Sequence, residues 1–100
     1  MSEHTAPSLA KLDAFFPKVQ ALAAGAERDR LVDETEALRR AVAAFHLEAI
    51  RFRFYNVERA IKLGGDNPVL RTPFEELRVE LEKAGFHTRS HAAPEQKPAQ

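Results

Sequence analysis

The sequence predicts an all-α protein of three helices, with a long central helix over about residues 27–63, assembling as a dimeric helical bundle. Three observations predict this class. Apolar residues recur at spacings of three and four, which places them on one side of a helix. Residues 27–63 contain neither glycine nor proline. A helix-capping motif followed by an apolar stripe opens a last helix near Thr72.

The first helix is expected between Thr5 and Gly25. Pro17 lies inside its apolar pattern, lacks a backbone donor and clashes with the preceding turn, so we expect a kink or a break near Phe16. Gly25 is a suitable end. The apolar positions of this helix are Leu9, Leu12, Phe15, Phe16, Val19, Leu22 and Ala23.

The central helix would be roughly 55 Å long at 1.5 Å per residue. Its first third is acidic and its last part is basic, and both biases suit the helix dipole. The alternation from Ile50 to Phe54 is also compatible with a strand. We favour the helix, because the alternation is short and strong helix formers continue on both sides.

The last helix follows a turn of composition GGDNP at residues 64–68. Thr72 is the expected N-cap, Pro73 the first helical residue and Glu75 the partner in a capping box. The helix should end at Gly85, with Phe86 folding back on Leu81. Its apolar stripe is Phe74, Leu77, Leu81 and Ala84.

These elements divide the chain into a flexible N-terminus at 1–6, a helical domain at 7–86 and a disordered tail at 87–100. The tail is polar and contains prolines, so it has too little apolar surface to order itself. His87 and His91 in this tail form a weak metal site at best, because they supply only two ligands.

The composition excludes several classes of protein. Fifteen basic and fifteen acidic residues cancel, so the whole chain lacks the charge of a nucleic-acid-binding protein. The absence of cysteine excludes disulfides and cysteine-ligated metals and suits a reducing cytoplasm, where we expect the protein. No signal peptide and no apolar run of about 18 residues is present, so we expect no membrane association.

Two apolar stripes run along the predicted central helix, roughly 140° apart on a helical wheel. The first and last helices cannot cover both stripes near its middle, and each large apolar side chain left in water would cost on the order of 2 kcal/mol. We therefore expect a second copy of the chain, or a second protein, to cover them. The expected interface residues are Phe45, Leu47, Ala49, Ile50, Phe52, Phe54, Asn56, Val57 and Ile61. Asn56 would set the register, and Glu58 is assigned to a solvated face.

Arg39, His46 and Arg53 are spaced by seven and form a cationic row between the two stripes. One interpretation is structural, with Arg53 paired to Glu80 and His46 a neutral hydrogen-bonded histidine. The other is a binding site for an acidic segment, a small anion or nucleic acid, because aligned arginines bind carboxylates and phosphates. Phe52 and Phe54 lie on the stripes rather than in the open, which argues against a nucleic-acid stacking platform.

No motif in the sequence indicates catalysis. No serine has a readable base beside it, and the glycines at 64–65 do not form a phosphate-binding loop. We therefore expect no enzyme activity, no cofactor and no metal. The predicted function is a small protein–protein interaction module of bacterial type, an adaptor or regulator acting as a homodimer. The alternative is a binder of anions, small ligands or nucleic acid through the cationic row.

Overall fold

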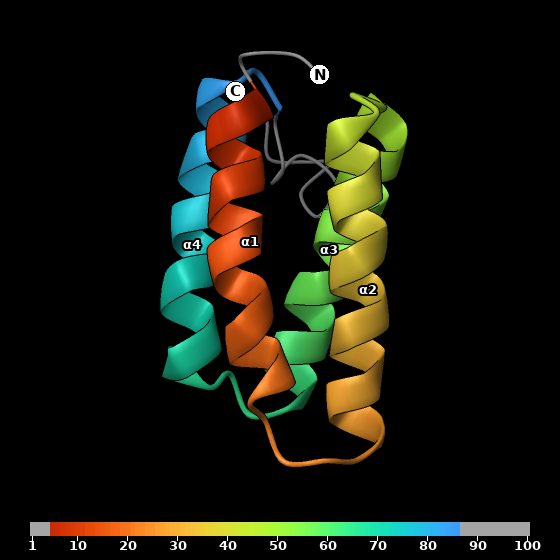
Figure 1. Cartoon of the computed structure of the whole chain (residues 1–100), viewed down its shortest axis with the longest axis vertical. Helices are drawn as coiled ribbons and strands as arrows, with labels where there is room; N and C mark the ends of the chain where they lie inside the picture. Colours follow the sequence, from red (N-terminus) through yellow and green to blue (C-terminus); the bar gives the residue numbers. More distant parts are fainter. Residues whose placement is uncertain (1–4, 87–100) are drawn as a thin grey trace, which may run out of the picture.

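The computed structural model describes residues 5–86, which form four α-helices and no strand (Figure 1). The helices are α1 (Ala6–Gln20), α2 (Ala26–Ala43), α3 (Leu47–Leu63) and α4 (Pro68–Lys83). Each helix runs antiparallel to the one before it, and α1 packs against both α2 and α4, while α2 packs against α3. The all-α prediction is confirmed, and the number of helices is corrected from three to four. The predicted tail at 87–100 and residues 1–4 of the predicted flexible N-terminus lie outside the described residues.

The predicted central helix is broken after Ala43. Phe45 has a φ of 58°, in the left-handed region, and so reverses the chain. The backbone N–H of Phe45 donates to the carbonyl of Val42 at 3.0 Å, and that of His46 donates to the carbonyl of Ala41 at 3.1 Å. This pair of bonds is a Schellman helix end, which normally carries glycine at the position that Phe45 occupies. Because a phenylalanine occupies this position, the sequence has no glycine or proline to mark the end of α2.

Two side chains stabilise the reversal. The Nδ1 atom of His46 accepts a hydrogen bond from the backbone N–H of Ala49 at 3.2 Å, so His46 is the N-cap of α3. The ring of Phe45 meets the edge of the Phe86 ring, with 5.5 Å between centroids. Since Phe86 follows α4, this contact ties the α2–α3 turn to the far end of the chain's last helix.

The course of α1 at Pro17 and the start of α4 also differ from the prediction. Helix α1 continues through Pro17 to Gln20, so a break near Phe16 is wrong, while the alternative of a kink there stays a prediction. Helix α4 begins at Pro68 rather than at Pro73, because the side-chain oxygen of Asn67 accepts a hydrogen bond from Val69 at 3.0 Å and caps the helix there. The Thr72 cap is therefore wrong, and Pro73 lies within the helix.

The end of α4 agrees with the sequence prediction. Gly85 has a φ of 102°, and the N–H of Phe86 donates to the carbonyl of Leu81 at 2.9 Å. Phe86 is buried at 4% exposure, so it folds back on the last turn as expected.

One side of each helix faces a common core. The rings of Phe54 and Phe74 stack at 4.4 Å between centroids, and Phe15 lies 6.1 Å from Phe74. Four residues assigned to a dimer interface are in this core, at 0–1% exposure: Ile50, Phe54, Val57 and Ile61. The break at Phe45 provides their cover within one chain, because it folds α3 back beside α2. The structure therefore assigns these four residues to the core rather than to a surface.

Candidate functional site

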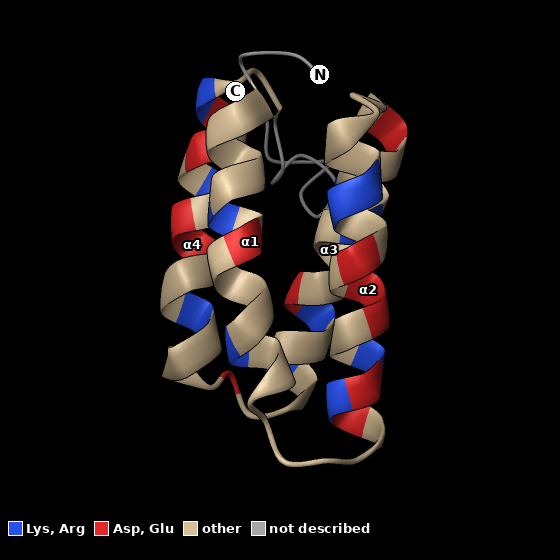
Figure 2. Ribbon diagram, viewed as in Figure 1, with Lys and Arg blue, Asp and Glu red and all other residues tan. Residues whose placement is uncertain are grey.

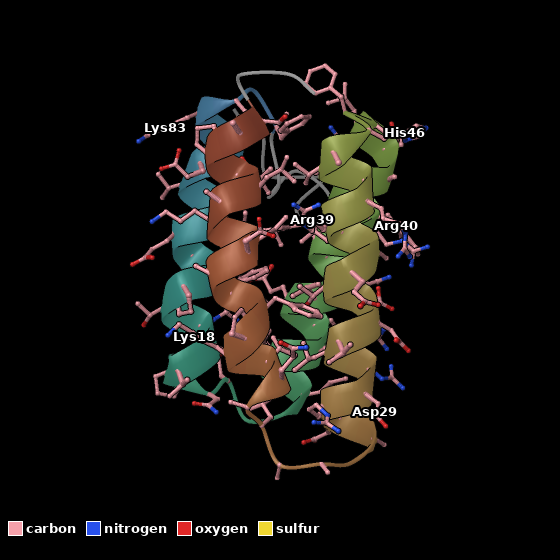
Figure 3. All side chains as sticks on the ribbon, in the orientation of Figure 1. Lys18, Asp29, Arg39, Arg40, His46 and Lys83 are labelled. Atoms are coloured by element: carbon pink, nitrogen blue, oxygen red, sulfur yellow. The ribbon has the colours of Figure 1, made fainter. Side chains whose placement is uncertain are left out.

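The predicted cationic row does not exist as one surface, because its members lie on two helices and the turn between them. Arg39 on α2 reaches α1, where its Nε and Nη2 atoms donate to the two oxygens of Asp13 at 2.7 and 3.2 Å. This hydrogen bonding is the main cause that lowers the pKa of the Asp13 carboxyl and raises the pKa of the Arg39 guanidinium. Figure 3 shows Arg39 between α1 and α2, with His46 at the end of the bundle.

Arg53 lies against α2 rather than α4. Its Nη1 atom is 3.5 Å from Oε1 of Glu34, and the side-chain amide of Asn56 donates to the same oxygen at 3.4 Å. The predicted partner Glu80 instead pairs with Lys83 at 3.7 Å. The prediction failed because α3 lies beside α2, so the side of α3 that carries Arg53 and Asn56 faces Glu34.

Each member of the predicted row thus has a role within the chain. Arg39 joins α2 to α1, Arg53 joins α3 to α2, and His46 caps α3. Figure 2 shows both acidic and basic residues on the visible sides of α2 and α4. The three side chains therefore make separate contacts in different parts of the chain.

The main charged cluster of the structure joins α3 and α4 and was missed by the sequence analysis. Arg78 is 2% exposed and donates from Nη2 to Oε2 of Glu58 at 2.8 Å and from Nε to Oε1 of Glu75 at 2.8 Å. Its guanidinium also lies over the Phe54 ring, 4.9 Å from the centroid. Arg71 donates to Glu58 at 3.1 Å and to Glu75 at 2.7 Å. Every charge in this cluster therefore has an opposite charge beside it.

The pKa values of the cluster follow from these contacts. The pKa of Glu75 is lowered overall. Burial of the carboxyl acts to raise this pKa, but the hydrogen bonds from Arg78 and Arg71 act in the opposite direction and outweigh burial. Burial likewise acts to lower the pKa of Arg78, and its bonds to Glu75 and Glu58 raise it instead. Both groups are held in their charged forms. A signal was present in the sequence, since Arg71, Glu75 and Arg78 are spaced by four and three and share one side of α4.

The exposed apolar side chains gather on α3 and on the turn before it. Five of the seven exposed large apolar side chains lie there, namely Phe45, Leu47, Phe52, Tyr55 and Leu63, at 36–68% exposure. Three of them, Phe45, Leu47 and Phe52, belong to the expected interface, whereas Ala49 and Asn56 are half-buried. The side of α3 that points away from the core carries Glu48, Phe52, Tyr55 and Arg59, which we call the α3 outer face.

A small cleft lies where the α1–α2 and α3–α4 turns meet. Its volume is about 200 Å³, and its lining includes Leu22, Glu27, Arg28, Leu31 and Asn67. No serine, threonine or histidine is among its lining residues, and Glu27 and Arg28 are its charged side chains. Within residues 5–86, no group of three histidine, aspartate or glutamate side chains could hold a metal ion.

No family model, curated protein or solved structure matches this chain. In the part of the chain that the structure describes, no helix is long and apolar enough to cross a membrane.

Proposed function

We propose that this protein is a non-catalytic interaction module that acts as a homo-oligomer, in its simplest form a dimer. The observation that carries the proposal is the concentration of exposed large apolar side chains between Phe45 and Leu63. Single exposed apolar residues are ordinary on a protein surface, but neighbouring ones mark interaction sites, and Phe52 and Tyr55 are neighbours one turn apart on α3. Aromatic residues such as Phe52 and Tyr55 are also enriched at the centres of interfaces.

The alternative function, binding of anions, small ligands or nucleic acid, has less support. It requires Arg39, His46 and Arg53 to face one ligand, and each of them contacts a different part of the chain. Both arginines already have a carboxylate partner within the chain, Asp13 for Arg39 and Glu34 for Arg53.

Sedimentation equilibrium over a wide range of protein concentrations tests the proposal. We expect self-association at high concentration, and we expect Phe52→Glu to weaken it at least tenfold by placing a charge on the α3 outer face. Val79→Glu is the matched control, because Val79 on α4 is 49% exposed and Phe52 is 50% exposed. A single-chain mass at every concentration would overturn the proposal, as would equal effects of the two substitutions.

A further inference from the structure

The α3 outer face has two aromatic side chains at its centre and opposite charges at its two ends. Glu48 and Arg59 lie at its two ends, with Phe52 and Tyr55 between them. The spacings of four, three and four residues place all four side chains within an arc of about 60° on the helix. This is also the spacing of the contact positions in a helix–helix seam.

Such a face matches itself when a second copy of α3 lies antiparallel to it. We propose that two copies of the chain pair through the α3 outer face, with a two-fold axis between residues 53 and 54. Glu48 of one copy then lies opposite Arg59 of the other, and Phe52 lies opposite Tyr55. The inference rests on the proposed function, and it adds the partner, the direction and the register.

Charge decides the direction of pairing. In the antiparallel arrangement, both ends of the seam bring a carboxylate to a guanidinium. A parallel arrangement would place Glu48 beside Glu48 and Arg59 beside Arg59, and like charges facing each other oppose association. An isologous two-fold interface requires this kind of self-complementary surface.

Glu48, Phe52 and Arg59 can make these contacts while the described contacts of α3 with α2 are kept. The Glu48 side chain is 83% exposed and lies 3.5 Å from Arg51 on its own helix. Arg59 is exposed and makes no ion pair within residues 5–86. Phe52 is half-exposed, and the Arg53 guanidinium lies 5.2 Å from its ring centroid while also meeting Glu34. The contact of Arg53 on α3 with Glu34 on α2 is therefore kept in the dimer.

Exchange of charge at the two ends of the seam tests the register. Glu48→Arg and Arg59→Glu should each weaken self-association at least tenfold, because each places two like-charged pairs in the dimer. The double variant should recover most of the loss, since it restores both pairs with their signs exchanged. A mixture of the two single variants should form a heterodimer in preference to either homodimer. The readout is sedimentation velocity of the full chain.

Spin labels provide a second measurement that does not depend on the charged pairs. The chain has no cysteine, so Arg51→Cys and Lys62→Cys each carry one label per copy. In the proposed register, the two labels are separated along the helix axis by about 8 Å at position 51 and about 26 Å at position 62, at 1.5 Å per residue. Electron paramagnetic resonance should therefore show strong close-range coupling for the first and a distance on the order of 30 Å for the second.

The outcomes separate this inference from the proposed function. A dimer whose two labels are both close would show parallel pairing, and a dimer that ignores the charge exchanges would use another surface. Either result overturns the register and leaves the homo-oligomer standing. A monomer at all concentrations overturns both.

Discussion

The guanidinium of Arg78 lies 4.9 Å from the centre of the Phe54 ring and donates to Glu58 at 2.8 Å, so one side chain of α4 contacts both the core and the charge of α3. Arg78 also lies 5.6 Å from the Phe74 ring centroid. Desolvated cations over aromatic rings contribute about 2 kcal/mol or more. This residue is the main polar link between the two helices.

We expect Arg78→Met to lower the free energy of unfolding by about 2 kcal/mol, measured by urea denaturation. The methionine keeps an apolar stem in the core, but Glu58 and Glu75 lose a partner. Fully buried pairs cost roughly 3–5 kcal/mol when one partner is removed. The two carboxylates here are 22% and 38% exposed, so water compensates in part.

The control is Arg40→Met at an exposed position of α2, which should change stability by less than about 0.5 kcal/mol. Equal stabilities for the two variants would contradict this account.

The charged cluster also predicts a dependence of stability on pH. The pKa of Glu75 is lower in the folded chain than the ordinary glutamate value that the unfolded chain has. A carboxyl with a depressed folded pKa contributes stability that is fully present above the unfolded pKa and is lost as the pH falls through the folded pKa. We expect Glu75→Gln to lower the urea midpoint at pH 7 and to change it much less near pH 3. A midpoint difference that is the same at both pH values would show that the Glu75 charge does not stabilise the fold.

The spacing of apolar residues was sufficient to predict the helical class and the end of α4 at Gly85. Those features depend on local signals, namely periodicity and a glycine in the left-handed region. The break at Phe45 could not be predicted in the same way, because a phenylalanine occupies a backbone conformation that usually requires glycine or asparagine.

That single missed reversal explains most of the other differences. With a continuous helix, Glu58 falls on a solvated face and Arg53 faces the last helix. With α3 folded back on α2, Glu58 instead meets Arg71 and Arg78, and Arg53 meets Glu34. These charged contacts depend on which helices lie side by side, so an error in the position of one turn gives Arg53 and Glu58 the wrong partners.

The pair of Arg53 and Glu34 should contribute little to stability. The two side chains are 40% and 25% exposed and 3.5 Å apart, which is typical of a surface ion pair. We expect a double-mutant cycle of Arg53→Met and Glu34→Gln to give a coupling of less than about 1 kcal/mol. The same cycle with Glu80→Gln in place of Glu34→Gln should give none, because Glu80 pairs with Lys83. Strong coupling to Glu80 would contradict the placement of α3 beside α2.

Substitutions at Phe45 test the break itself, since glycine and alanine have opposite preferences in the two possible backbones. Both Phe45→Gly and Phe45→Ala remove the ring contact with Phe86, so that loss cancels when the two variants are compared. At a φ of 58°, alanine carries a steric cost that glycine avoids, and we expect the glycine variant to be more stable by about 1 kcal/mol. In a continuous helix the order would be reversed by a similar amount, because glycine is about 1 kcal/mol worse than alanine in a helix interior. Urea denaturation of the two variants, measured side by side, therefore decides between four helices and three by the sign of one difference.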